Sequence, residues 1–231
     1  SHTNAQGSFS IKKEMFRNNI ACMKNIVNYC KKNNSKLIHL SSTSVYGKQA
    51  KIVNENDDHL LKPQSPYAEI KLIEENLLKK NKNKLKYVTF RFGTISGVSK
   101  GMRFHTAINK FCLNASLNEK IYVYKTAFNQ FRPYLSLKDA FKVFKFCVEK
   151  DLFDNQIYNA LSGNFTVKQI VNMIQIFKKK ISIKFVKSAI MNQLSYHVEN
   201  KKLKKKGLKL NSKIKLDIKE TLNLFKNLNY K

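Results

Sequence analysis

Apolar and polar positions in the first part of the chain alternate between the spacing of helices and that of strands. In residues 12–32 the apolar side chains recur every three to four positions, which predicts a helix. Two short apolar runs, at residues 36–40 and 85–92, predict buried strands. Between them, Ser65 followed by Pro66 is typical of a helix start, so we expect a helix that runs to about residue 80.

The rest of the chain continues this alternation with weaker signals. Further helices are predicted at residues 103–116, 137–149, 166–177, 199–206 and 217–228, and strands at 121–124, 134–135, 156–160 and 181–186. Residues 43–64 and the glycine-containing stretch at 93–101 are expected to be loops. The helix at 137–149 carries an aromatic and aliphatic stripe (Phe141, Phe144 and Val148), which we interpret as core packing. Strands that alternate with helices predict an α/β fold with a parallel sheet.

Composition allows a sizeable core but gives an unusual charge. The chain has 231 residues, 42% of them hydrophobic, a formal net charge of +29 and a sequence pI near 10.0. A charge of this size usually indicates nucleic acid or an anionic membrane as partner. Here it comes almost entirely from scattered lysines, so we interpret it as a solvated coat and do not expect a nucleic-acid partner.

Arginine is rare in this chain, which makes each one informative. The arginines are Arg17, Arg91, Arg103 and Arg132. Since lysine is used wherever a single positive charge suffices, the arginines are candidates for sites that need a planar, bidentate fork. For Arg17 an accidental surface position is the simpler interpretation.

The cysteines and the hydropathy pattern indicate a reduced, cytoplasmic protein. Cys22, Cys30, Cys112 and Cys147 show no metal-binding spacing, so we expect mostly buried thiols and no metal. No apolar run reaches about 18 residues, so no membrane span is expected. No signal peptide is recognised.

One pair of side chains predicts catalytic chemistry. Tyr67 and Lys71 lie four residues apart, which places them on one face of the predicted helix. An ammonium beside a phenol stabilises the phenolate, so we expect the pKa of Tyr67 to be lowered towards neutrality and its side chain to act as a general base. Two polar segments, at 41–44 and 93–97, follow predicted strands, and in parallel sheets such strand ends collect active sites.

Five segments in this order resemble motifs of the extended short-chain dehydrogenase/reductase family, in its nucleotide-sugar epimerase/dehydratase branch. They are Phe16-Arg17-Asn18-Asn19-Ile20, Leu40-Ser41-Ser42-Thr43-Ser44-Val45-Tyr46-Gly47, Ser65-Pro66-Tyr67-Ala68-Glu69-Ile70-Lys71, Arg91-Phe92-Gly93-Thr94-Ile95-Ser96-Gly97 and Arg132-Pro133-Tyr134-Leu135-Ser136-Leu137-Lys138-Asp139. The resemblance implies a partial Rossmann-like, doubly wound parallel sheet with a small C-terminal α+β substrate-binding region. It also implies a division into residues 1–97, the downstream part of the dinucleotide-binding domain, and 98–231, a substrate-binding region from which about 131–160 return to the core domain.

The resemblance also assigns roles to individual residues. Tyr67 would exchange a proton with a sugar hydroxyl while hydride passes to or from the nicotinamide of NAD or NADP, and Lys71 would also bond the nicotinamide ribose. Ser42, with Thr43 as its alternative, would bind the reacting oxygen of a nucleotide-sugar substrate. The expected lining of the cofactor or substrate cleft is Asn19, Ser41 and Thr94, and the expected diphosphate ligands are Arg132 and, second, Arg103.

Structural roles are the simpler expectation for several other polar residues. We expect Arg91 to pair with a carboxylate, Asp139 to cap the start of a helix and His39 to pack inside its strand. For His105, near the predicted substrate helix, both a structural and a functional role remain open.

Two departures from the family pattern shape the functional hypotheses. The chain has only seven glycines and no Gly-rich phosphate loop, so we expect it to be the downstream piece of a longer enzyme that forms a homodimer when full length. Where family dehydratases carry an acidic pair, this chain has Thr43 and Ser44, which argues against dehydration. The leading hypothesis is an epimerase-like enzyme; a reductase or dehydrogenase of the same fold and a basic RNA-binding module are the alternatives.

Overall fold

The computed structural model describes residues 7–187 and 196–226 and shows a chain of mixed helices and strands. Its helices are α1 (Lys12–Lys32), α2 (Pro66–Lys80), α3 (Ala107–Ser116), α4 (Leu137–Glu149), α5 (Val167–Phe177), α6 (Lys201–Lys205) and α7 (Ile214–Leu224). Its strands are β1 (Leu37–Ser42), β2 (Ile52–Val53), β3 (Tyr87–Phe92), β4 (Thr94–Ser96), β5 (Lys120–Tyr124), β6 (Phe131–Ser136), β7 (Ile157–Ala160), β8 (Gly163–Thr166), β9 (Ser182–Val186) and β10 (His197–Val198). The predicted α/β class is confirmed.

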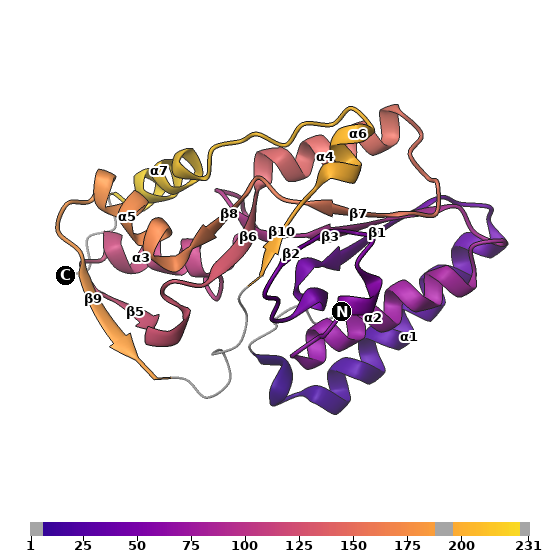
Figure 1. The fold of residues 1–231 in the computed structure, drawn as a ribbon, viewed down its shortest axis with the longest axis horizontal. Coiled ribbons are helices and arrows are strands. Elements are labelled where there is room, and N and C mark those ends of the chain that lie inside the picture. The colour runs from indigo at the N-terminus through magenta and orange to yellow at the C-terminus, as the bar shows by residue number, and fades with distance from the viewer. Residues whose placement is uncertain (1–6, 188–195, 227–231) are drawn as a thin grey trace.

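A parallel sheet with the order β1-β3-β7 forms the centre of the molecule. Helices α1 and α2 lie on one face of it, and α4 and α6 lie on the other (Figure 1). All six residues of β3 are buried, as expected for a central strand that is covered on both faces. Ser42 pairs with Phe92, and Phe92 pairs with Ala160, so the carboxyl ends of the three strands lie level at one edge of the sheet.

Each face of the central sheet has its own apolar core. On the α1 and α2 face the buried cluster consists of Met23, Val27, Cys30, Leu78, Leu85 and Tyr87. On the opposite face β3 and β7 pack against α4 and the segment around α6, through residues that include Phe90, Tyr158, Val143, Cys147 and Leu203. Burial on both faces is what fixes a short parallel sheet in place, because its strands have no hairpins to hold them together.

A second group of elements packs beside the central sheet. Strands β4, β6 and β8 form a mixed sheet, and β5 pairs with β9 in parallel. Helices α3, α5 and α7 share a core with β5, built from residues that include Ile108, Phe111, Ile121, Ile170, Ile174 and Ile218. These helices lie together at the end of the molecule away from α1 and α2 (Figure 1). The chain therefore has a second, mixed α+β core downstream of β3.

The structure corrects several expectations from the sequence. The stretch at 93–101 contains β4, and the predicted loop at 43–64 contains β2, both of which are too short to show a period. The stripe on α4 is not a core face: Phe141 and Val148 are 68% and 67% exposed, and only Phe144 packs against the core. The buried face of α4 is formed by Asp139, Ala140, Val143 and Cys147, whose smaller side chains allow the helix to approach the sheet. Of the helix predicted at 217–228, residues 227–228 lie outside the described residues.

Three further features of the described residues concern the edge of the sheet, the helices and the cysteines. Strand β1 is paired on one side only, with β3, so its other edge has no neighbouring strand among residues 7–187 and 196–226. No helix in the described part of the chain is long and apolar enough to cross a membrane. Cys30, Cys112 and Cys147 are buried free thiols, whereas Cys22 is exposed.

Candidate active site at the carboxyl end of β1

The candidate site begins where β1 ends. Ser42 is the cap of a short 3-10 turn over Thr43–Tyr46, and its Oγ accepts hydrogen bonds from the backbone N–H of Ser44 at 3.2 Å and from the Ser44 hydroxyl at 2.9 Å. The hydroxyl of Thr43 donates to the carbonyl oxygen of Phe92 at 3.2 Å, which ties the end of β1 to the end of β3. The turn closes at Gly47, whose φ of +62° suits glycine and whose missing Cβ leaves room for the carbonyl of Lys62.

Helix α2 brings the tyrosine to this turn. The hydroxyl of Ser65 accepts a hydrogen bond from the backbone N–H of Ala68 at 3.2 Å, and Pro66 occupies the first helical position, as the sequence predicts. Tyr67 follows in the first turn, and the hydroxyl of Ser42 is close enough to its phenol to act against the rise of its pKa. One turn further on, the ammonium of Lys71 lies 5.8 Å from the centroid of the Tyr67 ring. The structure thus brings all three predicted catalytic side chains together.

The predicted effect of Lys71 on Tyr67 is wrong for the free chain. Burial and the negative charge of Glu74 raise the pKa of Tyr67 to about 12, while Arg103 and the hydroxyl of Ser42 lower it only in part. The reason lies in the immediate partner of Lys71: its Nζ donates to the Oε2 atom of Glu74 at 2.8 Å. A lysine charge that is paired with a carboxylate at contact distance stabilises a nearby phenolate much less than a free one.

Glu74 is itself part of a buried chain of polar groups that crosses from α2 into the sheet. The same Oε2 atom lies 3.0 Å from Nε2 of His39 in β1, and Nδ1 of His39 lies 3.2 Å from Oγ1 of Thr89 in β3. Burial acts to raise the pKa of Glu74, but the hydrogen bonds and charges of His39 and Lys71 hold this pKa below its usual range. His39 is packed inside its strand, as expected, yet it also has a polar partner on each side.

A second buried network surrounds Arg91 and is structural. Arg91 binds Glu75 through two parallel hydrogen bonds, from Nε at 2.9 Å and from Nη2 at 2.7 Å, which confirms the expected pairing with a carboxylate. Its Nη1 donates to the hydroxyl of Tyr46 at 2.9 Å. Ser41 donates to the same Glu75 at 2.6 Å, so its side chain belongs to this network. The sequence analysis instead expects Ser41 to line the cofactor or substrate cleft.

Two further residues interact with this cluster, Arg132 and Tyr196, and the sequence analysis missed Tyr196. Tyr196 is buried, and the side chain of Thr43 and the charges of Arg132 and Tyr67 all act on the pKa of its hydroxyl. The Nε atom of half-buried Arg132 is buried without a hydrogen-bond partner among the described residues. Arg103 is exposed, yet its charge reaches Tyr67. Tyr196 stands far from every motif along the chain, so no local pattern points to it.

The remaining predicted residues lie in different surroundings. Asn19 is buried in α1, and Thr94 is half-buried at the start of β4, where it pairs with Tyr134. Asp139 does not cap α4: its carboxylate accepts hydrogen bonds from other segments and from Lys142. The donors from those segments are the hydroxyl of Ser162 at 2.7 Å, the backbone of Ser212 at 2.9 Å and the hydroxyl of Ser212 at 2.7 Å.

Two further residues near the catalytic cluster are Gly93 and His105. A Cβ at Gly93 would lie 3.0 Å from the backbone of Pro133, so glycine lets the end of β3 pass close to β6 without displacing that backbone. His105 is exposed at the surface, but partial desolvation of its ring and the charge of Arg103 lower its pKa. His105 therefore remains a polar residue near the site without a defined role.

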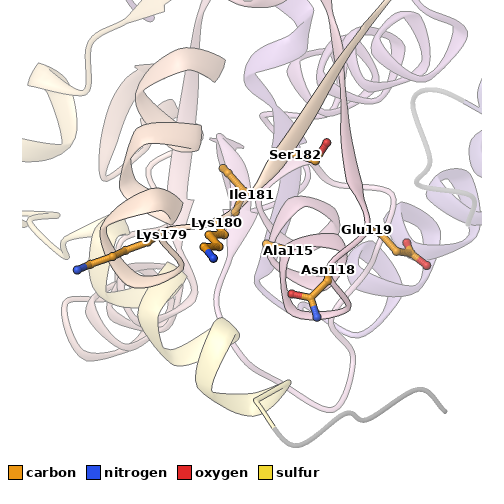
Figure 2. Close-up of a pocket in the computed structure, with 7 residues that line it drawn as sticks. All are labelled: Ala115, Asn118, Glu119, Lys179, Lys180, Ile181 and Ser182. Carbon is orange, nitrogen blue, oxygen red and sulfur yellow. The ribbon is translucent and has the colours of Figure 1, made fainter.

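A hollow among the described residues does not coincide with the catalytic cluster. It measures about 440 Å³ and lies between the end of α3 and the start of β9, lined by residues that include Asn118, Glu119, Lys179 and Lys180 (Figure 2). Its lysines and its glutamate point in different directions in this view rather than converging on one point. We therefore locate the candidate site at the carboxyl end of β1 from its side-chain chemistry.

Comparison with known proteins agrees with this geometry. The model of the NAD dependent epimerase/dehydratase family matches residues 3–160, which is more than half of the chain. The chain belongs to the NAD dependent epimerase/dehydratase family. A curated but uncharacterized protein of Methanocaldococcus jannaschii is 30% identical over 160 residues, which make up 68% of this chain and 47% of that protein. The chain thus spans about half the length of this relative.

Solved structures show the same fold. UDP-glucose 4-epimerase from Thermus thermophilus, in complex with NAD, superimposes with a TM-score of 0.86 at 18% identity, over 99% of this chain and 76% of that one. UDP-N-acetylglucosamine 4-epimerase from Methanobrevibacter ruminantium gives 0.84 at 24% identity, over 97% and 74%. The dTDP-glucose 4,6-dehydratase DesIV from Streptomyces venezuelae gives 0.86 at 15% identity, over 99% and 71%. At these identities the likeness shows a Rossmann-like α/β fold.

Proposed function

We propose that the protein to which this chain belongs is an NAD(P)-dependent nucleotide-sugar epimerase-like enzyme, with Tyr67 as its acid/base residue. The observation that carries the proposal is that the hydroxyls of Tyr67 and Ser42 are neighbours at the carboxyl end of β1, with the ammonium of Lys71 5.8 Å from the centroid of the Tyr67 ring. Two neighbouring hydroxyls can share a substrate hydroxyl placed between them, one as proton acceptor and the other as donor. Membership of the epimerase/dehydratase family supports this assignment.

The residues of the site fit the nicotinamide end of such a cofactor. Lys71 has three donors, of which Glu74 takes one at 2.8 Å, so donors remain for a ribose hydroxyl. When bound, NAD(P) supplies the hydride acceptor and donor for a sugar carbon. Among the structures with this fold, those of the Thermus epimerase and of DesIV contain NAD. Since the chain has seven glycines and no Gly-rich loop, we propose that the diphosphate of the cofactor is held by an upstream part of a longer enzyme.

Arg132 is the proposed ligand for the diphosphate of the substrate. Its Nε atom is buried and has no hydrogen-bond partner among the described residues, which is a costly state unless a ligand supplies an acceptor. A guanidinium presents parallel donors that match paired phosphate oxygens. Its position beside Tyr196, whose hydroxyl interacts with Thr43, would hold a nucleotide next to the hydroxyls of Ser42 and Tyr67.

Two hydroxyl side chains favour epimerisation over dehydration. Removal of water needs an acid for the departing hydroxyl and a base for the carbon proton. After Ser42 this chain has Thr43, whose hydroxyl is bonded to the carbonyl of Phe92, and Ser44, whose hydroxyl is bonded to Ser42. Neither can supply a carboxyl proton, whereas epimerisation needs only one acid/base group beside the cofactor.

In the proposed reaction Tyr67 takes the proton of a sugar hydroxyl as hydride leaves the carbon that bears it, and returns the proton after hydride comes back to the other face. Ser42 holds the oxygen in place during both transfers. Burial and Glu74 raise the pKa of Tyr67 to about 12, so the phenol must ionise more easily in the loaded site than in the free chain. The positive charges that this chain offers for the purpose are those of Lys71 and Arg103.

The decisive experiment is Tyr67→Phe in the full-length enzyme, assayed with NAD and UDP-hexoses. Loss of a positioned acid/base group should reduce turnover by about 10²–10⁴-fold. Tyr29→Phe is the matched control, because Tyr29 is 65% exposed on α1 and should be silent. Wild-type turnover by Tyr67→Phe with cofactor bound would refute the proposed role. Net consumption of NAD(P)H by the wild type would instead indicate a reductase, since epimerisation returns its cofactor unchanged.

A further inference from the structure

Glu74 and Glu75 are neighbours on α2, but only one of them has a role that the fold explains. Glu75 is paired through both oxygens with Arg91, and this pair fastens α2 to β3. Glu74 is also buried, yet no arginine compensates it. Its partners among the described residues are Lys71 on its own helix and His39 in β1, both at its Oε2 atom, at 2.8 and 3.0 Å. Burial of a charged carboxylate costs desolvation free energy. A buried carboxylate whose partner is the proposed catalytic lysine is therefore best explained by a role toward that lysine.

We propose that Glu74, supported by His39 and Thr89, is a positioning residue that fixes the ammonium of Lys71 one turn below Tyr67 and sets how much of its positive charge reaches the phenol. This inference rests on the proposed function, in which Lys71 tunes Tyr67. Glu74 lies three residues after Lys71 on α2, so the two side chains share one face of the helix. His39 binds the same carboxylate oxygen from the sheet and is itself oriented by Thr89, so the anchor spans α2, β1 and β3.

The groups around Tyr67 show why this anchor matters. The negative charge of Glu74, the positive charge of Arg103 and the hydroxyl of Ser42 act at the phenol, and the ammonium of Lys71 lies 5.8 Å from the ring centroid. The phenol also interacts with Tyr196. Lys71 lies 5.8 Å from the ring centroid because Glu74 draws its ammonium along the helix. Glu74 therefore opposes phenolate formation twice, by its own charge and by holding the lysine back. Loss of the carboxylate of Glu74 would remove its negative charge and would free the ammonium of Lys71, and both changes would stabilise the phenolate.

The test is the ionisation of Tyr67 in the ligand-free full-length enzyme, followed by NMR of 13Cζ-labelled tyrosine and assigned with Tyr67→Phe. Glu74→Gln should increase the ionisation constant of Tyr67 by about tenfold or more, the size expected when a neighbouring charge within contact range changes. Glu69→Gln is the matched control: it removes the same charge from the same helix, at a residue that forms a solvent-exposed ion pair with Lys12. This control should leave the titration of Tyr67 in place.

A double-variant cycle separates positioning of the lysine from a direct charge effect. If Glu74 acts through Lys71, the effect of Glu74→Gln should shrink at least by half in a Lys71→Met background. Glu74→Asp keeps the charge but withdraws it from the ammonium, so it should shift the titration in the same direction as Glu74→Gln, and it serves if Glu74→Gln does not fold. An unchanged titration in a folded Glu74 variant, or equal effects in both backgrounds, would overturn the proposal. Because no cofactor or substrate is present, these results are independent of whether Tyr67→Phe abolishes turnover.

Discussion

Arg91 and Arg132 mark two regions of the molecule that treat the same side chain in opposite ways. Arg91 is fully buried between α2 and β3 and finds acceptors on Glu75, Tyr46 and Asp58. Arg132 lies at the candidate site with its Nε buried and unpartnered within the described residues. A buried arginine whose donors are met internally stabilises the fold, whereas one that keeps a donor in reserve is prepared for an external acceptor. The contrast separates a structural region, around Arg91, from the proposed binding region, around Arg132.

The largest predicted effect is the loss of stability when Arg91, whose donors have internal acceptors, is removed. Arg91→Ala leaves the buried carboxylate of Glu75 without its counter-charge, which should lower the free energy of unfolding by about 3–5 kcal/mol. Urea denaturation followed by circular dichroism measures this change. Arg17→Ala, at an exposed position on α1, is the control and should stay within about 0.5 kcal/mol of wild type. A loss of less than about 1 kcal/mol for Arg91→Ala would mean that the network around it is not a stabilising one.

Substitution of Arg132 should lower the affinity for the substrate and should hardly change the stability of the fold. Arg132→Met removes a guanidinium that has no internal acceptor for its Nε among the described residues, so the unfolding midpoint should change little. Affinity for UDP, measured by calorimetry on the full-length enzyme, should fall by about 10–100-fold, the worth of one or two charge-assisted hydrogen bonds. Arg17→Met removes the same charge from the surface of α1 and should leave affinity unchanged. Equal affinity of the Arg132 variant and wild type would assign the diphosphate to another residue, with Arg103 the next candidate.

The smallest effect sharpens the comparison through pH. Burial acts to raise the pKa of Asp139, but hydrogen bonds from Lys142, Ser212 and Ser162 more than offset it and hold this pKa below its usual range. A folded-state pKa below the unfolded one contributes stability that is present above about pH 4 and is lost as the pH falls through the folded pKa. Asp139→Asn should therefore cost about 1 kcal/mol at neutral pH, and the difference from wild type should close in acid.

Urea denaturation of both proteins across a pH series checks this expectation. The matched control is Asp151→Asn, because Asp151 forms an exposed ion pair with Lys36 and should show a much smaller effect. A difference between Asp139→Asn and wild type that stays constant down to the lowest pH would contradict the linkage. In that case the loss would come from packing rather than from the ionised carboxylate.

The sequence locates the candidate site but not its electrostatics. The spacing of Tyr67 and Lys71 and the position of Ser42 at a strand end are local properties, so they predict which side chains meet. The direction of the pKa shift of Tyr67 depends on Glu74 and on burial, and neither follows from the Tyr/Lys spacing. The pairing of His39 with Glu74 joins a strand to a helix and has no signature in a single chain.

The errors in the fold have a similar origin. A stripe such as Phe141, Phe144 and Val148 shows that a helix has an apolar face, but which face meets the sheet depends on how closely the helix can approach. Here Ala140 and Val143 lie inward and Phe141 does not. Strands of two or three residues, such as β2 and β4, are made by their partners, so their own sequence carries too little pattern to predict them. Tyr196 reaches Thr43 only because the chain folds back across β6, to whose residue Phe131 its backbone N–H donates at 3.2 Å.

The flank of β1 that is unpaired among the described residues lies next to the proposed active site. An unpaired flank of a strand presents backbone amides and carbonyls that can pair with another extended segment. Such a segment would continue the hydrogen-bond ladder of the sheet up to Ser42, which is the residue that acts on the hydroxyl of Tyr67. The strand that pairs with β1 would then complete both the sheet and the surroundings of the proposed active site. A preparation in which this flank stays unpaired should aggregate through its strand edge. Pairing of the flank with another strand should prevent that aggregation and should also be needed for catalytic activity.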